Sequence, residues 1–179
     1  PSTGLPTKTE QSDLLQVLFG RNGDSPMPVI APISPTDCFH SAYLACQIAV
    51  QHMTPVVVLS DAYIANGSGS WRLPIVTELP EIRPHKVKAN STTPYSPYQR
   101  DPESLARYWA TPGMQGCEHV VGGLEKDNET GSISNKPDNH ALMTRVRAEK
   151  VARIPVTDIH VLGDKNDADL LIVGFGGTF

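Results

Sequence analysis

Hydroxyl side chains gather at the start of the chain, in a turn rich in glycine and proline that leads into a predicted helix. Thr3 and Thr7 lie on either side of Gly4, and Lys8 follows directly. Such a turn presents hydroxyl and backbone N–H groups, which at a helix N-terminus favour an anionic ligand. The alternative is a capping box between Thr7 and Glu10, which alone accounts for a threonine at this position. The residues leave both interpretations open.

Two further groups come directly after predicted strands. Asp61 follows the strand predicted at 56–59, at the carboxyl end where open α/β sheets bind their ligands. A carboxylate at that position is also typical of a cap for the following helix. The glycines of 174–177 follow the apolar run 170–173 and match part of a dinucleotide-binding fingerprint. Because its third glycine would lie beyond Phe179, we interpret 174–177 as a packing turn.

Metal-ligating side chains are scattered along the sequence. The 6 histidines show no spacing typical of a metal site, and the 3 cysteines are too few for a cubane iron–sulfur cluster, which needs four ligands. We therefore expect this chain to hold no metal, and any such cluster to belong to a partner. The cysteines are widely spaced and odd in number, which argues against a disulfide framework and predicts a reducing, cytoplasmic compartment.

The composition is typical of a globular domain. The 179 residues carry 15 Lys and Arg against 19 Asp and Glu, a net charge of −4, and 39% of them are hydrophobic. No apolar run approaches the roughly 18 residues that a membrane helix needs, and no basic face indicates nucleic-acid binding. We expect neither a membrane nor a nucleic acid as partner.

A βαβ unit is the fold element that the sequence predicts most strongly. The apolar runs 28–31 and 56–59 are typical of strands, and the second is continuous enough to be covered on both faces. Between them, 34–37 supplies a cap, a first-turn proline and an acid for a helix over 34–53, whose inner face consists of small residues. Strand, helix and strand then form a parallel βαβ unit. Ahead of it, a short helix is predicted from Thr7 to Gly20.

The second half of the sequence predicts a long connector. From about 66 to 135, glycine, proline and hydroxyl residues alternate with aromatic ones, and we expect this segment to lie on another surface and contact a partner. A β-hairpin is predicted around the polar turn 126–130 and a helix over 138–153. The inward-facing residues of that helix are predicted to be Leu142 and Val146, and the outward-facing ones Arg145, Arg147, Glu149 and Lys150. The run 170–173 predicts a buried strand, which needs a sheet to join, so we expect a fragment cut at both ends.

The opening PSTGLPTKTEQSDL is the most specific stretch of the sequence. It is supported by TPVVVLSD with YIANG at 54–67, by LE at 124–125 and by RAEKVARI at 147–154. These stretches resemble the α subunit of 2-oxoglutarate:ferredoxin oxidoreductases. The resemblance implies an α/β fold with three parts. They are the later half of a pyrimidine-type thiamine diphosphate-binding domain built on a parallel sheet (1–70), an extended connector with hairpin and helix (71–155), and the truncated start of a transketolase C-terminal-like domain (156–179).

The resemblance also implies a chemistry, namely oxidative decarboxylation of 2-oxoglutarate to succinyl-CoA and CO₂ with electrons passed to ferredoxin. In that family the β subunit of an α2β2 enzyme mainly holds thiamine diphosphate, its Mg²⁺ and an iron–sulfur cluster, and coenzyme A is a co-substrate. This chain would supply one wall of the active site. Thr7 would contact the 2-oxoacid through its hydroxyl, and Thr3 and Gly4 would shape the turn. Lys8 would pair with the distal carboxylate of the substrate.

Two functional residues of the family have no match in this sequence, and three alternative functions stay open. The family's pyrimidine-contacting glutamate and a substrate-binding arginine would lie before Pro1, so we expect no catalytic residue here and no activity from the fragment alone. The same chemistry on pyruvate or a branched-chain 2-oxoacid would differ only in pocket residues. A non-catalytic subunit-assembly module would use Thr7 merely as a helix cap. A nucleotide-binding protein would use the glycines of 174–177.

Overall fold

The computed structural model describes residues 12–87, 94–155, 159, 161–164 and 166–179. Its helices and strands follow in the order α1 (Ser12–Phe19), β1 (Val29–Ile30), α2 (Cys38–Gln51), β2 (Val57–Val58), α3 (Ala62–Asn66) and α4 (Pro137–Ala152), with two single-turn 3-10 helices, η1 (Val76–Glu78) and η2 (Gly176–Thr178). No helix of these described residues is long and apolar enough to cross a membrane.

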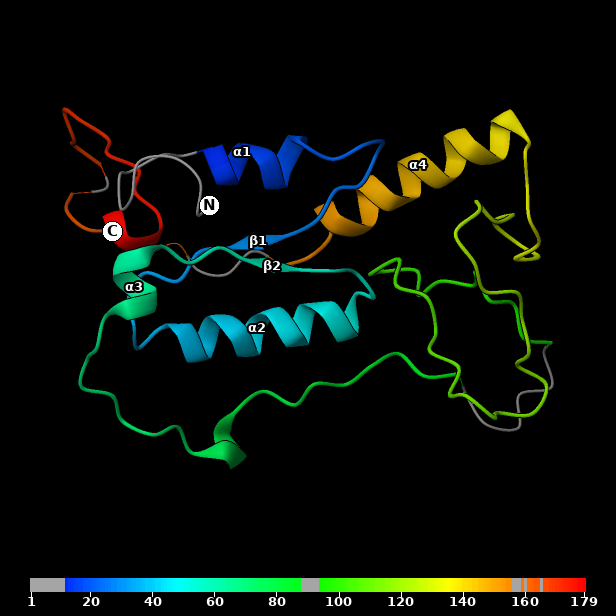
Figure 1. Cartoon of the computed structure of the whole chain (residues 1–179), viewed down its shortest axis with the longest axis horizontal. Helices are drawn as coiled ribbons and strands as arrows, with labels where there is room; N and C mark the ends of the chain where they lie inside the picture. The colour runs from blue at the N-terminus through cyan, green and yellow to red at the C-terminus, as the bar shows by residue number, and fades with distance from the viewer. Residues whose placement is uncertain (1–11, 88–93, 156–158, 160, 165) are drawn as a thin grey trace.

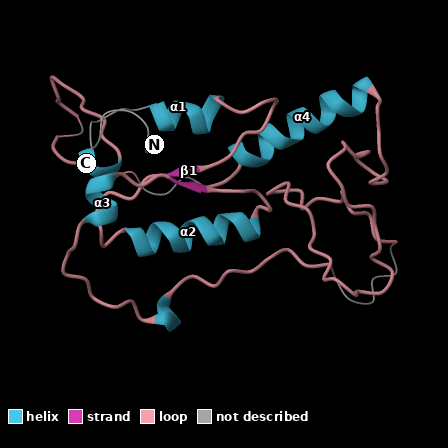
Figure 2. Cartoon of the chain, viewed as in Figure 1, coloured by secondary structure: helices cyan, strands magenta, loops and turns pink. Residues whose placement is uncertain are grey.

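The predicted βαβ unit is confirmed. β1 and β2 pair in parallel, with Val29 opposite Val57. Helix α2 connects them and buries Ser41, Ala45 and Ile48. The predicted inner face of small residues is only partly right, because Ala45 is buried whereas Ala42 and Cys46 are exposed. Figures 1 and 2 show α2 on one side of the two strands and α1 on the other. Small side chains on α2 let the helix approach the strands closely, and the continuous Val-rich run at 56–59 supplies the β-branched residues that favour a strand.

Helix α2 begins later than predicted, because residues 34–37 form a separate turn before it. The Asp37 N–H donates to Ser34 Oγ at 3.2 Å. The carboxylate of Asp37 in turn accepts from the Ile33 N–H at 3.0 Å and from the Ser41 hydroxyl at 3.2 Å. The predicted cap and first-turn proline therefore close a turn, and Cys38 is the first helical residue.

Two predictions about strands are wrong. Strand β2 is shorter than 56–59, and Val58 is 40% exposed, so it is not covered on both faces. The run 170–173 forms no strand, and its side chains are 74% to 82% exposed. The physical reason is the same in both places. An apolar run becomes a buried strand only beside other strands, and within the described residues the sheet has two.

The connector lies along α2 of its own chain. The ring of Trp71 packs against Phe39, with ring centroids 5.3 Å apart. The hydroxyl of Tyr43 on α2 donates to the Pro80 carbonyl at 2.6 Å. In Figure 1 this green segment runs beside α2, on the side away from the strands. The surface on which it lies thus includes α2, and the expected contact with a partner stays a prediction.

The predicted hairpin is reduced to a small turn. Lys126 and Ile133 form a single antiparallel bridge, and the Asp127 N–H donates to the Ser132 carbonyl at 2.7 Å. Residues 120–124 do not pair, and Val121 is 85% exposed. The Asp127 carboxylate accepts from the N–H groups of 129 and 130 and closes the turn locally. The turn chemistry was recognisable, but the flanking runs lack a sheet to extend them.

The inward face of α4 differs from the predicted one. Asn139 and Met143 are buried, whereas Leu142 and Val146 are only half-buried. Lys150, predicted to face outward, is half-buried as well. The surface that α4 covers is irregular connector backbone, whose N–H and C=O groups need hydrogen-bonding partners. Polar side chains on the covered face meet that need, so apolar periodicity alone misplaces the face.

Candidate functional site

The carboxyl ends of β1 and β2 form the edge of the sheet at which α/β proteins usually bind ligands. Because the strands are parallel, the residues after each of them leave the sheet at the same edge. Helix η2 lies against this edge, where Gly176 is buried beside Ala31 and Asp61. Figure 1 shows the C-terminal end of the chain next to α3. Segments more than a hundred residues apart in sequence therefore meet at this edge.

Asp61 joins two segments at this edge, and it uses both of its carboxylate oxygens to do so. Oδ1 accepts from the Ile64 N–H at 2.8 Å and thereby caps α3. Oδ2 accepts from the Gly177 N–H at 2.9 Å. The cap interpretation of Asp61 is confirmed, and the second bond adds a role that its position in the sequence did not reveal. Each carboxylate oxygen can accept more than one hydrogen bond, so these two bonds leave the exposed Asp61 able to accept from a ligand as well.

The glycine turn at 174–177 packs on Asp61, and at Gly177 it has no space for a larger residue. Gly176 has a φ of +61°, a left-handed conformation that favours glycine. A Cβ on Gly177 would lie 2.2 Å from Asp61 Oδ2. The carboxylate occupies the amide that a dinucleotide phosphate would need, and its negative charge repels such a phosphate. The packing-turn interpretation is therefore confirmed.

Replacing Gly177 with Ala is expected to detach the turn from Asp61. The new Cβ forces the carboxylate away, which breaks the bond to residue 177 and weakens the cap of α3, a loss of about 1–2 kcal/mol. Amide hydrogen exchange in the full-length protein should become faster in η2 and α3. Gly122→Ala is the matched control, because nothing lies within 4 Å of a Cβ there. Unchanged exchange at both elements in Gly177→Ala would contradict the assignment.

The substrate-binding residues predicted from the sequence lie outside the described residues. Thr3, Gly4, Thr7 and Lys8 all belong to 1–11. The capping box between Thr7 and Glu10 lies outside as well. Helix α1 does follow directly, and it ends where expected, with the Gly20 N–H donating to the Gln16 carbonyl at 2.8 Å.

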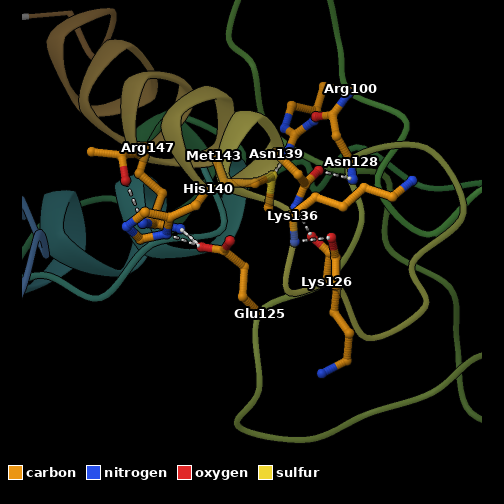
Figure 3. A network of polar contacts seen from close by, with 11 residues as sticks. Arg100, Glu125, Lys126, Asn128, Lys136, Asn139, His140, Met143 and Arg147 are labelled. Carbon is orange, nitrogen blue, oxygen red and sulfur yellow. Dashed lines mark hydrogen bonds and ion pairs between the residues drawn. The ribbon is translucent and has the colours of Figure 1, made fainter.

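A second cluster, which the sequence did not predict, joins the connector to α4 (Figure 3). The Asn139 amide donates to the Lys126 carbonyl at 3.0 Å and accepts from the Asn128 N–H at 2.9 Å. Beside it, the Glu125 carboxylate lies 2.9 Å from His140 Nδ1 and 3.6 Å from an Arg147 nitrogen. In the sequence, the only signal for this cluster is an asparagine one helical turn before a methionine. It is a weak signal, because a polar residue on a helix usually indicates a face that is exposed to solvent.

Lys150, a residue of α4, caps the C-terminal end of α2. Its ammonium group donates to the Met53 carbonyl at 2.8 Å, just beyond the last turn of α2. A cation is favourable there because the helix dipole is negative at that end. Burial, and then the charges of Arg107, Arg100 and Arg147, lower the pKa of Lys150 from its ordinary 10.5 to about 8. Burial also lowers the pKa of neighbouring His52.

Because the pKa of Lys150 is lowered in the folded chain, the free energy of unfolding should depend on pH. The folded chain holds its proton below about pH 8, and the unfolded chain holds it up to about 10.5. Between these values the unfolded state binds more protons, so the contribution of Lys150 to the free energy of unfolding rises with pH. Relative to Lys150→Met, the wild-type full-length protein should therefore gain thermal stability between pH 8 and pH 10. A constant difference, or a loss, would contradict the lowered pKa.

The chain was compared with known proteins. Residues 1–138 match the family model described as pyruvate flavodoxin/ferredoxin oxidoreductase, thiamine diphosphate-binding. Subunit KorA of the 2-oxoglutarate oxidoreductase of Mycobacterium tuberculosis is 53% identical over 179 residues, which is all of this chain and 27% of that protein. The α subunit of 2-oxoacid:ferredoxin oxidoreductase 2 of Aeropyrum pernix is 31% identical over 183 residues, covering 99% of this chain and 28% of that one.

A solved structure is also similar. The 2-oxoglutarate:ferredoxin oxidoreductase from Magnetococcus marinus, with 2-oxoglutarate, coenzyme A and succinyl-CoA bound, superposes with a TM-score of 0.77 and 31% sequence identity. The match covers 94% of this chain and 29% of that chain. The chain thus spans little more than a quarter of the length of these relatives.

Proposed function

Since the chain belongs to the pyruvate flavodoxin/ferredoxin oxidoreductase family by its thiamine diphosphate-binding domain, we propose that it is part of the α subunit of an enzyme that oxidises 2-oxoglutarate. The observation that carries the proposal is the 53% identity, over the whole chain, to a subunit named for 2-oxoglutarate. The solved relative with 2-oxoglutarate and coenzyme A bound supports the same substrates.

The reaction converts 2-oxoglutarate and coenzyme A into succinyl-CoA and CO₂, and the two electrons released pass to ferredoxin. Within it, this chain supplies substrate contacts. Thr7 donates a hydrogen bond to the 2-oxoacid, and Thr3 and Gly4 form the turn that presents Thr7. Lys8 pairs with the distal carboxylate, which pyruvate lacks. The proposal for these four residues rests on their match to the family's opening motif.

Residues 1–138 match a thiamine diphosphate-binding family model, which supports that cofactor for the enzyme, whereas the described residues offer no site for Mg²⁺ or an iron–sulfur cluster. No three His, Cys, Asp or Glu side chains lie together among them in a way that would hold a metal ion. Their glycine turn at 174–177 is bound to Asp61 rather than open to a diphosphate. We therefore place the metal centres, and most of the cofactor's contacts, on a β subunit, and derive no step of the reaction through them from this chain.

The proposed enzyme is a cytoplasmic α2β2 assembly that reduces ferredoxin. Relatives named as α subunits support a partner subunit. The three free cysteines, Cys38, Cys46 and Cys117, support a reducing compartment. Domain division at 70 and 155 is part of the same proposal, with the transketolase C-terminal-like domain beginning after α4.

The proposal is tested on the full-length protein purified with its partner. Native mass spectrometry should find two copies of each subunit, and ferredoxin should be reduced only when 2-oxoglutarate and coenzyme A are both present. A lone α chain, or reduction that does not need the 2-oxoacid, would contradict the proposal. An intact assembly without turnover would favour the subunit-assembly module instead.

A further inference from the structure

Two arginines of the connector face each other directly. Arg100 and Arg107 form an antiparallel bridge, closed by the turn in which the Asp101 N–H donates to the Ala106 carbonyl at 2.8 Å. Both guanidinium groups lie over the ring of Tyr98, at 5.7 Å and 4.7 Å from its centroid. Like charges directly opposite each other in an antiparallel pair are destabilising. The cation–π contacts with one ring offset this cost in part.

Lys150 adds a third cation to this pair. This end of α4 lies beside the turn of the two arginines, because Arg153, three residues after Lys150, donates to the Pro102 and Glu103 carbonyls at 2.9 Å and 3.1 Å. The charges of both arginines also lower the pKa of Lys150. Figure 3 shows Arg100 beside α4, where it contacts Met143, and Lys150 lies seven residues, about two turns, further along that helix. All three side chains are half-buried. We call Arg100, Arg107 and Lys150 the cationic cluster.

Three carboxylates of the neighbouring segments, those of Asp101, Glu125 and Glu149, have other partners. Asp101 accepts from the Ser104 N–H and hydroxyl, both at 2.8 Å, and so serves its own turn. Glu125 pairs with His140 and Arg147. Glu149 pairs with the other arginines of α4, at 145 and 153. Within the part of the chain that the structure describes, no ion pair neutralises the cationic cluster.

Two members of the cationic cluster have hydrogen-bond donors without a partner among the described residues. Arg107 uses one terminal nitrogen, which donates to the Pro97 carbonyl at 3.3 Å, and its Nε and second terminal nitrogen have no partner among the described residues. Lys150 uses one of its three N–H bonds, to Met53. Guanidinium forks match the oxygen geometry of phosphate, and a phosphate carries close to two negative charges at neutral pH.

We propose that the cationic cluster binds the phosphate group of a small molecule, which accepts hydrogen bonds from the Arg107 guanidinium and the Lys150 ammonium. The dianion neutralises most of the triple charge and accepts the donors that the chain leaves unused. A single carboxylate would leave two of the three charges uncompensated. The site stands on connector and α4 residues and does not depend on which 2-oxoacid the enzyme uses.

Protection of Lys150 from acylation tests the proposal in the wild-type full-length protein. At pH 8, millimolar inorganic phosphate should slow acetylation of Lys150 about fivefold or more, because a bound dianion raises the pKa of the amine by about one unit or more. Sodium chloride at equal ionic strength should not do so, and the exposed Lys136 should react at the same rate in both salts. Equal rates at Lys150 in phosphate and chloride would overturn the proposal.

Variants separate a site from general screening. Arg107→Gln should abolish the phosphate protection of Lys150, whereas Arg145→Gln, on the exposed side of α4, should keep it. If Arg107→Gln does not fold, Arg107→Lys keeps a charge without the fork and should weaken the protection. Protection that is unchanged in the folded variant at position 107 would overturn the proposal. Because acylation is read without substrate, its outcome is independent of the proposed enzyme activity.

Discussion

Replacing Thr7 with Val in the intact enzyme is expected to lower kcat/KM for 2-oxoglutarate by about ten- to a hundredfold. Valine keeps the shape of threonine and removes the hydroxyl that is proposed to donate to the substrate. A hydrogen bond to a charged group contributes about 1.5–3 kcal/mol, and about 1.4 kcal/mol corresponds to a factor of ten. Steady-state ferredoxin reduction at varied 2-oxoglutarate measures this effect.

Two matched variants distinguish a substrate contact from a helix cap. Thr7→Ser keeps the hydroxyl and should retain most of the activity, and Thr9→Val removes a neighbouring hydroxyl that has no proposed role. Native mass spectrometry of each variant checks that the subunits still assemble. If Thr7→Val assembles and turns over like the wild type, Thr7 is a cap for the helix that follows, and the assembly-module alternative gains support.

Replacing Asn139 with Ala is expected to release the connector turn from α4, at a cost of about 2–4 kcal/mol. The variant loses two hydrogen bonds and leaves the buried Lys126 carbonyl and the half-buried Asn128 N–H without a partner. Amide hydrogen exchange of 125–134 in the full-length protein should become at least about tenfold faster, in keeping with that loss.

Asn135→Ala is the matched control for this experiment. Asn135 is an exposed asparagine just before α4, and its side chain makes no hydrogen bond with other described residues. Its replacement should leave the exchange of the turn unchanged. If Asn139→Ala also leaves the exchange unchanged, the turn is held by other contacts, and the network of Figure 3 does not anchor the connector.

The βαβ unit could be predicted from the sequence because each of its signals is local. A β-branched run at 56–59, the helical spacing of small residues over α2 and a proline after that helix all point to the same structure, although they do not identify which face of α2 is buried. Asp61 was placed at the sheet edge for the same reason. Its bond to Gly177 could not be predicted, because it joins residues 116 positions apart and depends on how the chain returns to the sheet.

The covered face of α4 and the exposure of 170–173 show where pattern reasoning fails. Asn139 and Lys150 are polar, so periodicity places them toward solvent, yet they satisfy backbone groups of the connector and of α2. The run 170–173 is apolar, so its pattern predicts burial, yet burial requires neighbouring strands that the described residues do not supply. In both cases, burial depends on the surface that packs against the segment. The sequence of the segment alone does not specify that surface.

The proposed substrate is tested most directly by the ratio of kcat/KM for 2-oxoglutarate to that for pyruvate, measured on the intact enzyme with coenzyme A and ferredoxin. We expect a preference for 2-oxoglutarate of at least about tenfold, because a pairing such as that proposed for Lys8 with the distal carboxylate contributes about 1.5 kcal/mol or more. Equal values of kcat/KM for the two acids, or a higher value for pyruvate or a branched-chain 2-oxoacid, would contradict 2-oxoglutarate as the substrate.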